Sequence, residues 1–282
     1  MKYEKQDLDF LEDLEDVKEF LSKFKVSTQK NYIAAIIVAL SAYGDEYEDS
    51  LKNYREYLDT IHETYKSEYE TGEKSEKQEK NWLELSQLRK VSNYWKRELM
   101  ERDVFDKRTL NTKQMGILQK WVVSNLFIHD ENPPTRLDYA PMKILSQIEY
   151  DRLLPRDAKA NNYLVIKSRN DKKFHFNEYK TAGKYGENVV KVGKKLNSVI
   201  NIWLKYNTSN NFLINTKGDM LSSNGLGKLI KDTYKPTGKD ITINMLRHIF
   251  ISEKFPNVDQ ERQETASKMG HSIEQQSKYS KT

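Results

Sequence analysis

The chain has no cysteine in its 282 residues, which excludes disulfide bonds, thiolate zinc sites and cysteine nucleophiles. Its five histidines are scattered and lack the spacing of metal ligands. No apolar run approaches the roughly 20 residues that span a membrane, and residues 32–40, the longest, suit a buried helix. The N-terminus lacks the apolar core of a secretory signal. We therefore expect an intracellular, water-soluble protein that uses no metal and no other cofactor.

Charge is unevenly distributed along the chain, although the net charge is only +5. Residues 1–110 carry 19 Lys and Arg against 25 Asp and Glu, whereas the remaining residues carry 28 against 17. A basic C-terminal part favours a polyanionic partner, and nucleic acid is the usual one. The alternative is a lysine-rich surface that has no such partner.

Helical periodicity dominates the first third of the chain. Apolar residues recur every three or four positions in residues 7–24, where Asp7 can cap a helix whose other face is acidic. That face could bind a partner or be an ordinary solvated surface. Further helices are predicted at residues 27–42, 50–69 and 82–99. The pattern predicts an all-α domain at residues 1–105, followed by a linker at residues 106–111.

The pattern changes after residue 112. A helix is predicted at residues 112–128, and it must end before Pro133 and Pro134 because proline cannot continue a helix. Alternating or continuous apolar runs then predict strands, and later periodic segments predict helices. The strands are expected at residues 163–166, 174–176, 188–192 and 212–214, and the helices at 194–205, 223–233, 242–254 and 258–269. We predict that residues 112–282 form a mainly helical domain with a small antiparallel β-sheet.

Two arginines in this second domain stand out because of their surroundings. Arg136 follows two prolines, where we expect the boundary between a loop and a helix, and Arg247 lies on a largely apolar predicted helix. An arginine in an apolar neighbourhood needs an anionic partner, and its planar fork can hold two oxygens at once. Each arginine could instead pair with a carboxylate of the protein, which would be Asp138 in the case of Arg136.

Three further residues could complete a site for metal-free phosphoryl transfer, which needs a nucleophile, cations and a proton donor. Lys180 precedes a glycine-marked turn at residues 181–186, from which it could reach DNA and donate a proton. His271 follows Gly270 and could equally cap a helix. Tyr279 is one of seventeen tyrosines. Each has an ordinary structural explanation when taken singly, so the interpretation depends on their order and context.

In that order and context the C-terminal part resembles the tyrosine recombinase (phage integrase) family. Members carry an early arginine, a lysine on a β-hairpin, a His-x-Leu-Arg-His segment, a Leu-Gly-His-Ser segment and a nucleophilic tyrosine. The corresponding segments here are Pro-Pro-Thr-Arg136-Leu-Asp-Tyr, Tyr-Lys180-Thr-Ala-Gly-Lys, Asn244-Met-Leu-Arg247-His, Met-Gly-His271-Ser and Tyr279. The resemblance covers about residues 110–282, and it implies that residues 1–105 are the helical DNA core-binding domain of the family.

The resemblance implies a site-specific recombinase that cleaves and rejoins double-stranded DNA and assembles on it as a tetramer. Tyr279 would attack the scissile phosphate, giving a 3′-phosphotyrosyl bond and a free 5′-hydroxyl. Arg136 and Arg247 would stabilise the phosphate, and Lys180 would protonate the leaving 5′-oxygen. No metal or nucleotide is implied, because the covalent bond conserves the energy of the phosphodiester.

The sequence departs from the family pattern at two places. Asn244 replaces the first histidine of His-x-Leu-Arg-His, and asparagine can donate a hydrogen bond but cannot act as a general base. The spacing of eight residues between His271 and Tyr279 is one shorter than the commonest spacing. We expect His271 and Asn244 to donate hydrogen bonds to the phosphate, and we expect the loop before Tyr279 to compensate for the shorter spacing.

Three alternatives remain open. A type IB topoisomerase uses the same chemistry as a monomer, and Asn244 is compatible with a DNA-binding protein whose recombinase site has decayed. A purely structural helical protein is the third alternative, which the combined pattern disfavours. Only three residues follow Tyr279, so we expect protomer contacts from residues 7–24 or 45–80 instead of a C-terminal tail. The form of the first arginine motif suggests a virus or mobile element, whose enzyme would act on DNA in the nucleus or cytoplasm of a host.

Overall fold

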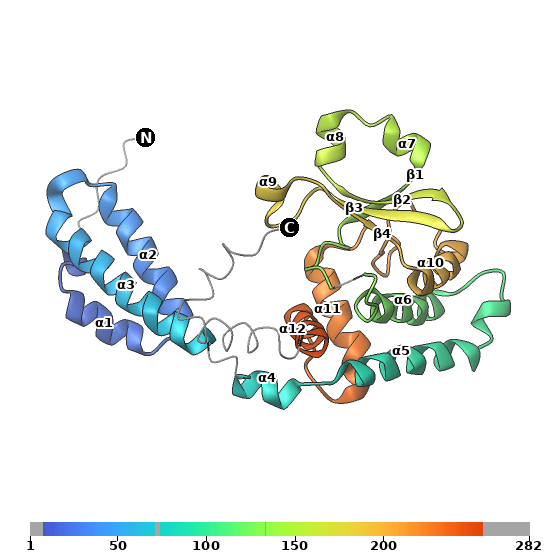
Figure 1. Ribbon diagram of the computed structural model, residues 1–282, viewed down its shortest axis with the longest axis horizontal. Coiled ribbons are helices and arrows are strands. Elements are labelled where there is room, and N and C mark those ends of the chain that lie inside the picture. The colour runs from blue at the N-terminus through green and yellow to red at the C-terminus, as the bar shows by residue number, and fades with distance from the viewer. Residues whose placement is uncertain (1–7, 71–73, 133, 256–282) are drawn as a thin grey trace, which may run out of the picture. The chain divides into compact units, whose positions relative to one another are not determined.

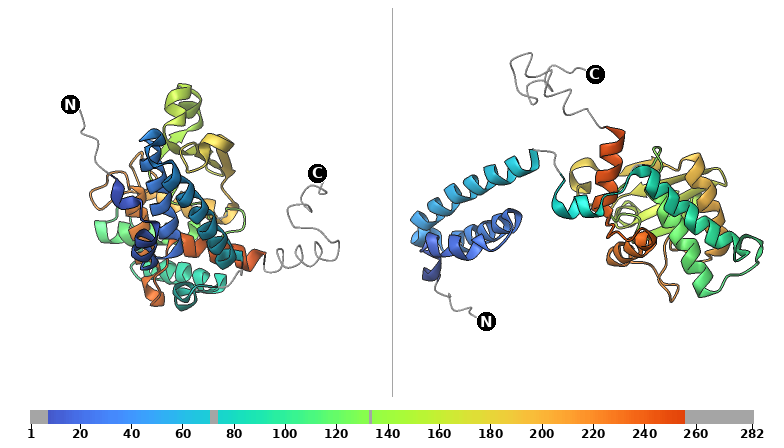
Figure 2. Two further views of the ribbon diagram at one scale, coloured as in Figure 1. Left: turned by 90° about the vertical axis from the view of Figure 1, so that its left-hand side faces the viewer. Right: turned by 90° about the horizontal axis from the view of Figure 1, so that it is seen from below.

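The computed structural model describes residues 8–70, 74–132 and 134–255. Packing divides the chain into two compact units, Met1–Ser75 and Glu76–Thr282 (Figures 1 and 2). The first unit contains 10 Lys and Arg against 18 Asp and Glu, and the second contains 37 against 24. The charge asymmetry of the sequence therefore coincides with the division into two packed units.

The N-terminal unit is helical throughout its described part. It contains η1 (Asp9–Leu11), α1 (Leu14–Ser22), α2 (Val26–Ser41), η2 (Gly44–Tyr47) and α3 (Glu48–Glu70). The predicted helix at residues 7–24 is divided, because the carboxylate of Asp13 accepts hydrogen bonds from the backbone N–H groups of Glu15 and Asp16 (3.0 and 3.2 Å) and starts α1 there. The expected cap, Asp7, lies outside the described residues. The other two predicted helices of this unit are confirmed as α2 and α3.

The C-terminal unit contains the remaining helices. They are α4 (Glu76–Asn81), α5 (Leu85–Met100), η3 (Val104–Asp106), α6 (Thr112–Leu126), α7 (Gln147–Asp151), α8 (Pro155–Lys159), α9 (Ala182–Tyr185), α10 (Lys194–Tyr206), α11 (Ser223–Tyr234), η4 (Lys235–Thr237) and α12 (Ile243–Lys254). Helices α10, α11 and α12 match the predicted ones closely. The predicted helix at residues 258–269 lies outside the described residues. No helix in the described ranges has the length and hydropathy that a membrane crossing requires.

The boundary between the units differs from the predicted linker at residues 106–111. Helix α5, expected in the N-terminal domain, packs against α6, and its Trp95 indole donates to the carbonyl oxygen of Thr233 (2.9 Å). The predicted linker is held in the C-terminal unit, where the Tyr206 hydroxyl donates to the carbonyl oxygen of Lys107 (3.1 Å). The division falls instead within residues 71–80, which contain no apolar residue that could enter a core.

The sheet has four strands in the order β1-β2-β3-β4. The strands are β1 (Met142–Ser146), β2 (Asn162–Ser168), β3 (Asp171–Phe176) and β4 (Asn188–Lys191). The expectation of a mainly helical fold with a small sheet is confirmed, but the sheet is mixed, because β1 pairs with β2 in parallel. A parallel pair needs a crossover connection, which α7 and α8 provide. At the predicted strand of residues 212–214, Phe212 and Leu213 are buried, but the range forms only one isolated bridge, between Ile214 and Met220.

Different helices cover the two faces of the sheet (Figure 1). Lys172 of β3 donates to the side-chain oxygens of Asn197 and Asn201 on α10 (2.8 and 2.7 Å), whereas the neighbouring His175 ring contacts Tyr150 of α7 with 4.4 Å between ring centroids. Burial lowers the pKa of Lys172, and its three hydrogen bonds satisfy the buried ammonium. The sheet is thereby fixed to helices on both sides.

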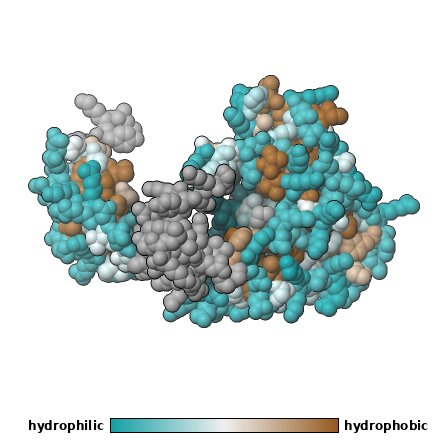
Figure 3. All heavy atoms as spheres, in the orientation of Figure 1, coloured by the Kyte–Doolittle hydropathy of each residue, from teal (hydrophilic) through white to brown (hydrophobic). Residues whose placement is uncertain are grey.

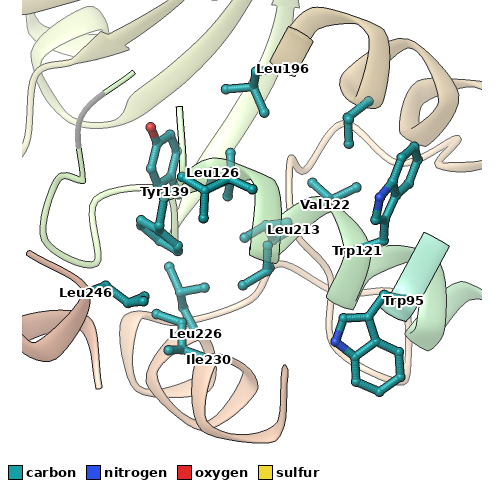
Figure 4. Packing of buried hydrophobic residues seen from close by; sticks show 14 of the residues in the cluster. Trp95, Trp121, Val122, Leu126, Tyr139, Leu196, Leu213, Leu226, Ile230 and Leu246 are labelled. Carbon is teal, nitrogen blue, oxygen red and sulfur yellow. The ribbon is translucent and has the colours of Figure 1, made fainter. Parts of the chain in front are cut away.

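A single hydrophobic core joins α5, α6, α10, α11 and α12 to the inner face of the sheet. Figure 4 shows Leu126 of α6 and Leu226 of α11 near Tyr139, which lies in the segment between α6 and β1. Tyr139 is 1% exposed and packs edge-on against Phe127, Phe174 and Phe176. The core therefore holds a loop as well as helices and strands.

Candidate active site

Arg136 lies in the loop that joins α6 to β1, and not at the start of a helix as we predicted. Buried residues hold this loop on both sides of the arginine. The Asn132 side chain accepts a hydrogen bond from the backbone N–H of Gly193 (2.9 Å), and Tyr139 enters the hydrophobic core. Ser223, at the start of α11, donates to the carbonyl oxygen of Ala140 (2.7 Å). The half-buried Arg136 is therefore attached to a well-anchored loop.

Lys180 lies in the connection between β3 and β4, four residues after the end of β3. The sequence predicted this lysine directly at the end of a strand, but the intervening residues form bends before α9. The Lys180 side chain is exposed. The turn predicted after it, at residues 181–186, does lie between two antiparallel strands.

Asn162 connects the Arg136 loop to the Lys180 connection. It is 4% exposed at the start of β2. Its side-chain nitrogen donates to the carbonyl oxygens of Asp138 and Glu178 (both 3.0 Å). Its side-chain oxygen accepts from the backbone N–H groups of Asn177 and Glu178 (2.9 and 2.8 Å). One buried amide thus makes four hydrogen bonds and sets the distance between the two segments that carry Arg136 and Lys180.

Asn244 and Arg247 lie on the first turns of α12, three positions apart and therefore on neighbouring parts of one helix face. Thr242 caps the helix by accepting from the backbone N–H of Met245 (3.3 Å). Leu246, on a neighbouring face of the helix, is completely buried and points toward the core in Figure 4. This burial fixes the rotation of α12, so that Asn244 is exposed and Arg247 is half-buried.

These elements meet at a cavity of about 640 Å³. Arg136, Lys180 and Asn244 all line it, together with Asp138, Glu178 and Ser223. Arg247 does not line the cavity. Its charge nevertheless acts on the carboxylate of Asp138, which does line it. Three of the six predicted site residues therefore line one cavity, and a fourth, Arg247, acts electrostatically on Asp138 in its lining.

Neither arginine forms an ion pair with a carboxylate of the described residues. Asp138 accepts a hydrogen bond from the backbone N–H of Arg136 (3.1 Å), but the guanidinium group of Arg136 forms no ion pair with it. Arg247 likewise forms no ion pair within residues 8–70, 74–132 and 134–255. Two half-buried guanidinium groups without a carboxylate partner in these ranges are suited to binding an anion that enters the cavity.

Asp138 adds a titratable carboxyl group to the cavity. Burial raises its pKa above the ordinary value, and this effect exceeds the opposing effects of the backbone hydrogen bond from Arg136 and the charges of Arg136 and Arg247. The ionised carboxylate competes with an entering anion for the two arginines. Protonation of Asp138 should therefore strengthen the binding of the anion, and a bound anion should favour the protonated form of Asp138.

We predict that Asp138→Asn strengthens the binding of a polyanion at the cavity several-fold at neutral pH, because the amide keeps the acceptor for Arg136 N–H but carries no charge. In the unchanged protein, binding should strengthen as the pH falls through the raised pKa of Asp138. Fluorescence anisotropy with a labelled duplex at a series of pH values measures both effects. A variant whose pH dependence equals that of the unchanged protein would contradict this role of Asp138.

The remaining two predicted site residues, His271 and Tyr279, lie outside the described residues. Asp138 was predicted only as an ion-pair partner of Arg136, and Asn162 was not predicted as a site residue. Asn162 precedes a predicted strand, but nothing in the sequence indicates which distant carbonyl and N–H groups its amide contacts. No protein-family model, curated protein or solved structure matches the chain.

Proposed function

We propose that this protein is a tyrosine-type site-specific DNA recombinase, which cleaves and rejoins double-stranded DNA through a 3′-phosphotyrosyl intermediate. The observation that carries the proposal is the cavity lined by Arg136, Lys180 and Asn244, with Arg247 acting on the same wall. These residues were selected from motif order alone, and 108 positions separate the first of the three lining residues from the last. Their convergence supports a phosphate-binding site that is assembled from distant segments.

The proposed reaction assigns one task to each side chain. The Tyr279 oxygen attacks the scissile phosphorus, and the bond to the 5′-oxygen breaks while the phosphotyrosyl bond forms. Arg136 and Arg247 bind the non-bridging oxygens, where negative charge increases in the transition state. Lys180 transfers a proton to the leaving 5′-oxygen. Rejoining reverses these steps with the 5′-hydroxyl of the same or another strand.

Hydrogen-bond donation completes the assignment. Asn244 lines the cavity and can donate from its amide to the phosphate, a task that we also give to His271. Asparagine cannot remove the proton from the tyrosine, so the proton must pass to another group or to water. We expect strand cleavage to be slower than it would be with a histidine at this position.

The charge of the C-terminal unit, with 37 basic against 24 acidic residues, supports DNA as the substrate. The N-terminal unit, with 10 basic against 18 acidic residues, should contribute little electrostatic attraction to DNA. We therefore propose that the C-terminal unit supplies most of the affinity for DNA, and that the N-terminal unit binds DNA through shape and neutral contacts. We also propose that four protomers assemble on the recombining duplexes.

Covalent trapping with Tyr279→Phe tests the proposed chemistry. The unchanged protein, incubated without added metal, should form a denaturation-resistant adduct with nicked suicide duplexes taken from the flanks of the encoding element and from a random pool. Tyr279→Phe should form none, because phenylalanine has no oxygen nucleophile. Tyr185→Phe is the matched control, since Tyr185 is an exposed tyrosine on α9 and should be dispensable. Adduct formation by Tyr279→Phe would reject the assignment of the nucleophile.

A DNA-binding protein with a decayed recombinase site is the second candidate, and the position of Asn244 in the cavity is the observation that favours it. Binding without an adduct on any duplex would support this candidate. Asn244→His would then be the informative variant, because recovery of adduct formation would identify the lost group. Exchange of strands between two duplexes, as opposed to relaxation of supercoiled DNA, separates a recombinase from a type IB topoisomerase.

A further inference from the structure

A second cavity lies in the C-terminal unit and shares no lining residue with the Arg136 cavity. Its volume is about 760 Å³, and it is bordered by the start of α6, by α11 and by residues 214–221. Apolar side chains form much of its lining: Leu110, Met115, Ile117, Ile214, Leu221 and Leu229. We call this cavity the α6–α11 groove. A groove of this size and composition can receive aromatic side chains of a partner.

Lysines stand at the edge of the α6–α11 groove. Lys120 forms an ion pair with Asp232 (2.6 Å between Nζ and Oδ2), so these two charges cancel. Lys113 and Lys217 are exposed, line the groove and have no ion-pair partner in the described part of the chain. The apolar lining is therefore bordered by two uncompensated positive charges, which favour an acidic partner.

The N-terminal unit carries an exposed aromatic surface with charges of both signs beside it, since Lys23 Nζ lies 5.8 Å from the centroid of the Phe20 ring. Phe20 on α1 and Tyr32 on α2 are 55% and 46% exposed. Phe24 lies between them, with ring centroids 5.5 Å from each, so the three rings form a continuous aromatic patch. Asp16 and Glu19 are exposed on the same part of α1 as Phe20. Hydrophobic residues also interrupt the hydrophilic surface of this unit in Figure 3.

We propose that the aromatic patch of one copy docks in the α6–α11 groove of a second copy. The apolar rings would fill the apolar groove, while Asp16 and Glu19 would approach Lys113 and Lys217. The opposite charges of the two units favour the same pairing at longer range. Aromatic side chains that fill pockets supply much of the energy of protein interfaces.

Such a contact is heterologous, because it joins two different surfaces of the same chain. Each copy carries one patch and one groove, so copies can follow one another head to tail and close into a ring. A ring is one way to build the four-protomer assembly proposed above. The docking itself needs neither DNA nor Tyr279, so it can be tested independently of the proposed reaction.

The absence of cysteine makes a direct cross-linking test possible. One preparation carries Lys23→Cys, beside Phe20, and a second, with a tag of different size, carries Thr216→Cys at the groove, so that the aromatic rings, Lys113 and Lys217 stay in place. Each molecule then has a single thiol, so a short bis-maleimide can join the two preparations only between molecules. We expect a cross-linked pair in DNA-free solution. Asp59→Cys on α3 and Lys159→Cys on α8 are exposed controls away from the two surfaces and should give at least tenfold less product.

A charge exchange shows whether the contact is specific. Lys113→Glu with Lys217→Glu should weaken concentration-dependent association, measured by sedimentation, by about tenfold or more, because like charges then face each other. Asp16→Lys with Glu19→Lys in the partner preparation should restore it. Cross-linking no greater than in the controls, or association that is unchanged by the reversal of charge, would overturn the proposal. Loss of DNA cleavage in Tyr279→Phe would leave both measurements unaltered.

Discussion

Replacement of Arg136 or Arg247 with alanine is expected to slow adduct formation on a suicide duplex by about 10²–10³-fold, as observed when one preorganised donor to a developing oxyanion is removed. Both guanidinium groups are half-buried and have no carboxylate partner in the described ranges. Their charge is therefore available to the phosphate, and it should matter more in the transition state than in the bound duplex. DNA affinity should fall by a much smaller factor than the rate of cleavage.

Two comparisons separate catalysis from charge and from stability. Arg156→Ala removes an equal charge from α8, where the side chain is 90% exposed, and it should leave the cleavage rate nearly unchanged. Arg136→Lys keeps the charge but loses the planar fork, so its rate should lie between those of the unchanged protein and Arg136→Ala. Single-turnover measurements of adduct formation give these rates.

Thermal unfolding completes the first prediction. A half-buried arginine without a carboxylate partner gains little from the folded protein itself, so Arg136→Ala and Arg247→Ala should unfold at the same temperature as the unchanged protein or slightly higher. If both variants lost several kcal/mol of stability, the arginines would be structural. If both cleaved DNA at the unchanged rate, the proposed phosphate site would be wrong.

Local patterns in the sequence predicted most helices of the fold, because their apolar spacing and caps are local properties. Helices α10, α11 and α12 lie where the periodicity placed them. Strand β1 was missed, because its five residues show no clear alternation and its pairing with β2 depends on a connection through α7 and α8. The division between the units was misplaced for a related reason. The unit to which α5 belongs depends on the element that its apolar face packs against, and that face packs against α6.

Local sequence patterns had the same limit at the candidate site. Motif order was enough to select Arg136, Lys180 and Asn244, which line one cavity. It could not indicate how the segments that carry them are held together, because hydrogen bonds between distant backbone groups leave no local signal. Asn162 looks in the sequence like an ordinary polar residue before a strand, and only its four partners reveal its position between two loops.

Asn162→Ala should therefore have a large effect without touching the cavity chemistry. The substitution leaves two carbonyl oxygens and two backbone N–H groups without their partner, in a region where Asn162 itself is 4% exposed. Leaving buried polar groups unsatisfied costs about 1–3 kcal/mol. We expect a loss of stability of about this size, which urea unfolding measures.

The same substitution should also reduce cleavage, because Asn162 sets the distance between the Arg136 loop and the Lys180 connection. A displacement of about 1 Å in a catalytic group can reduce a rate by roughly 10²-fold. Asn162→Asp tests the geometry more finely. It keeps the two accepted hydrogen bonds, but its carboxylate faces the carbonyl oxygens of Asp138 and Glu178, which should push the two segments apart.

Asn197→Ala is the matched control, since Asn197 is a buried asparagine (7% exposed) that also bonds across the unit, to Lys172 of β3. It lies on α10 and does not line the cavity. Both alanine variants should lose stability, but only Asn162→Ala should lose the roughly 10²-fold in cleavage when the rates are measured where each protein is fully folded. Equal cleavage by the two variants would mean that Asn162 supports the fold alone, and that the two loops find their positions around DNA without it.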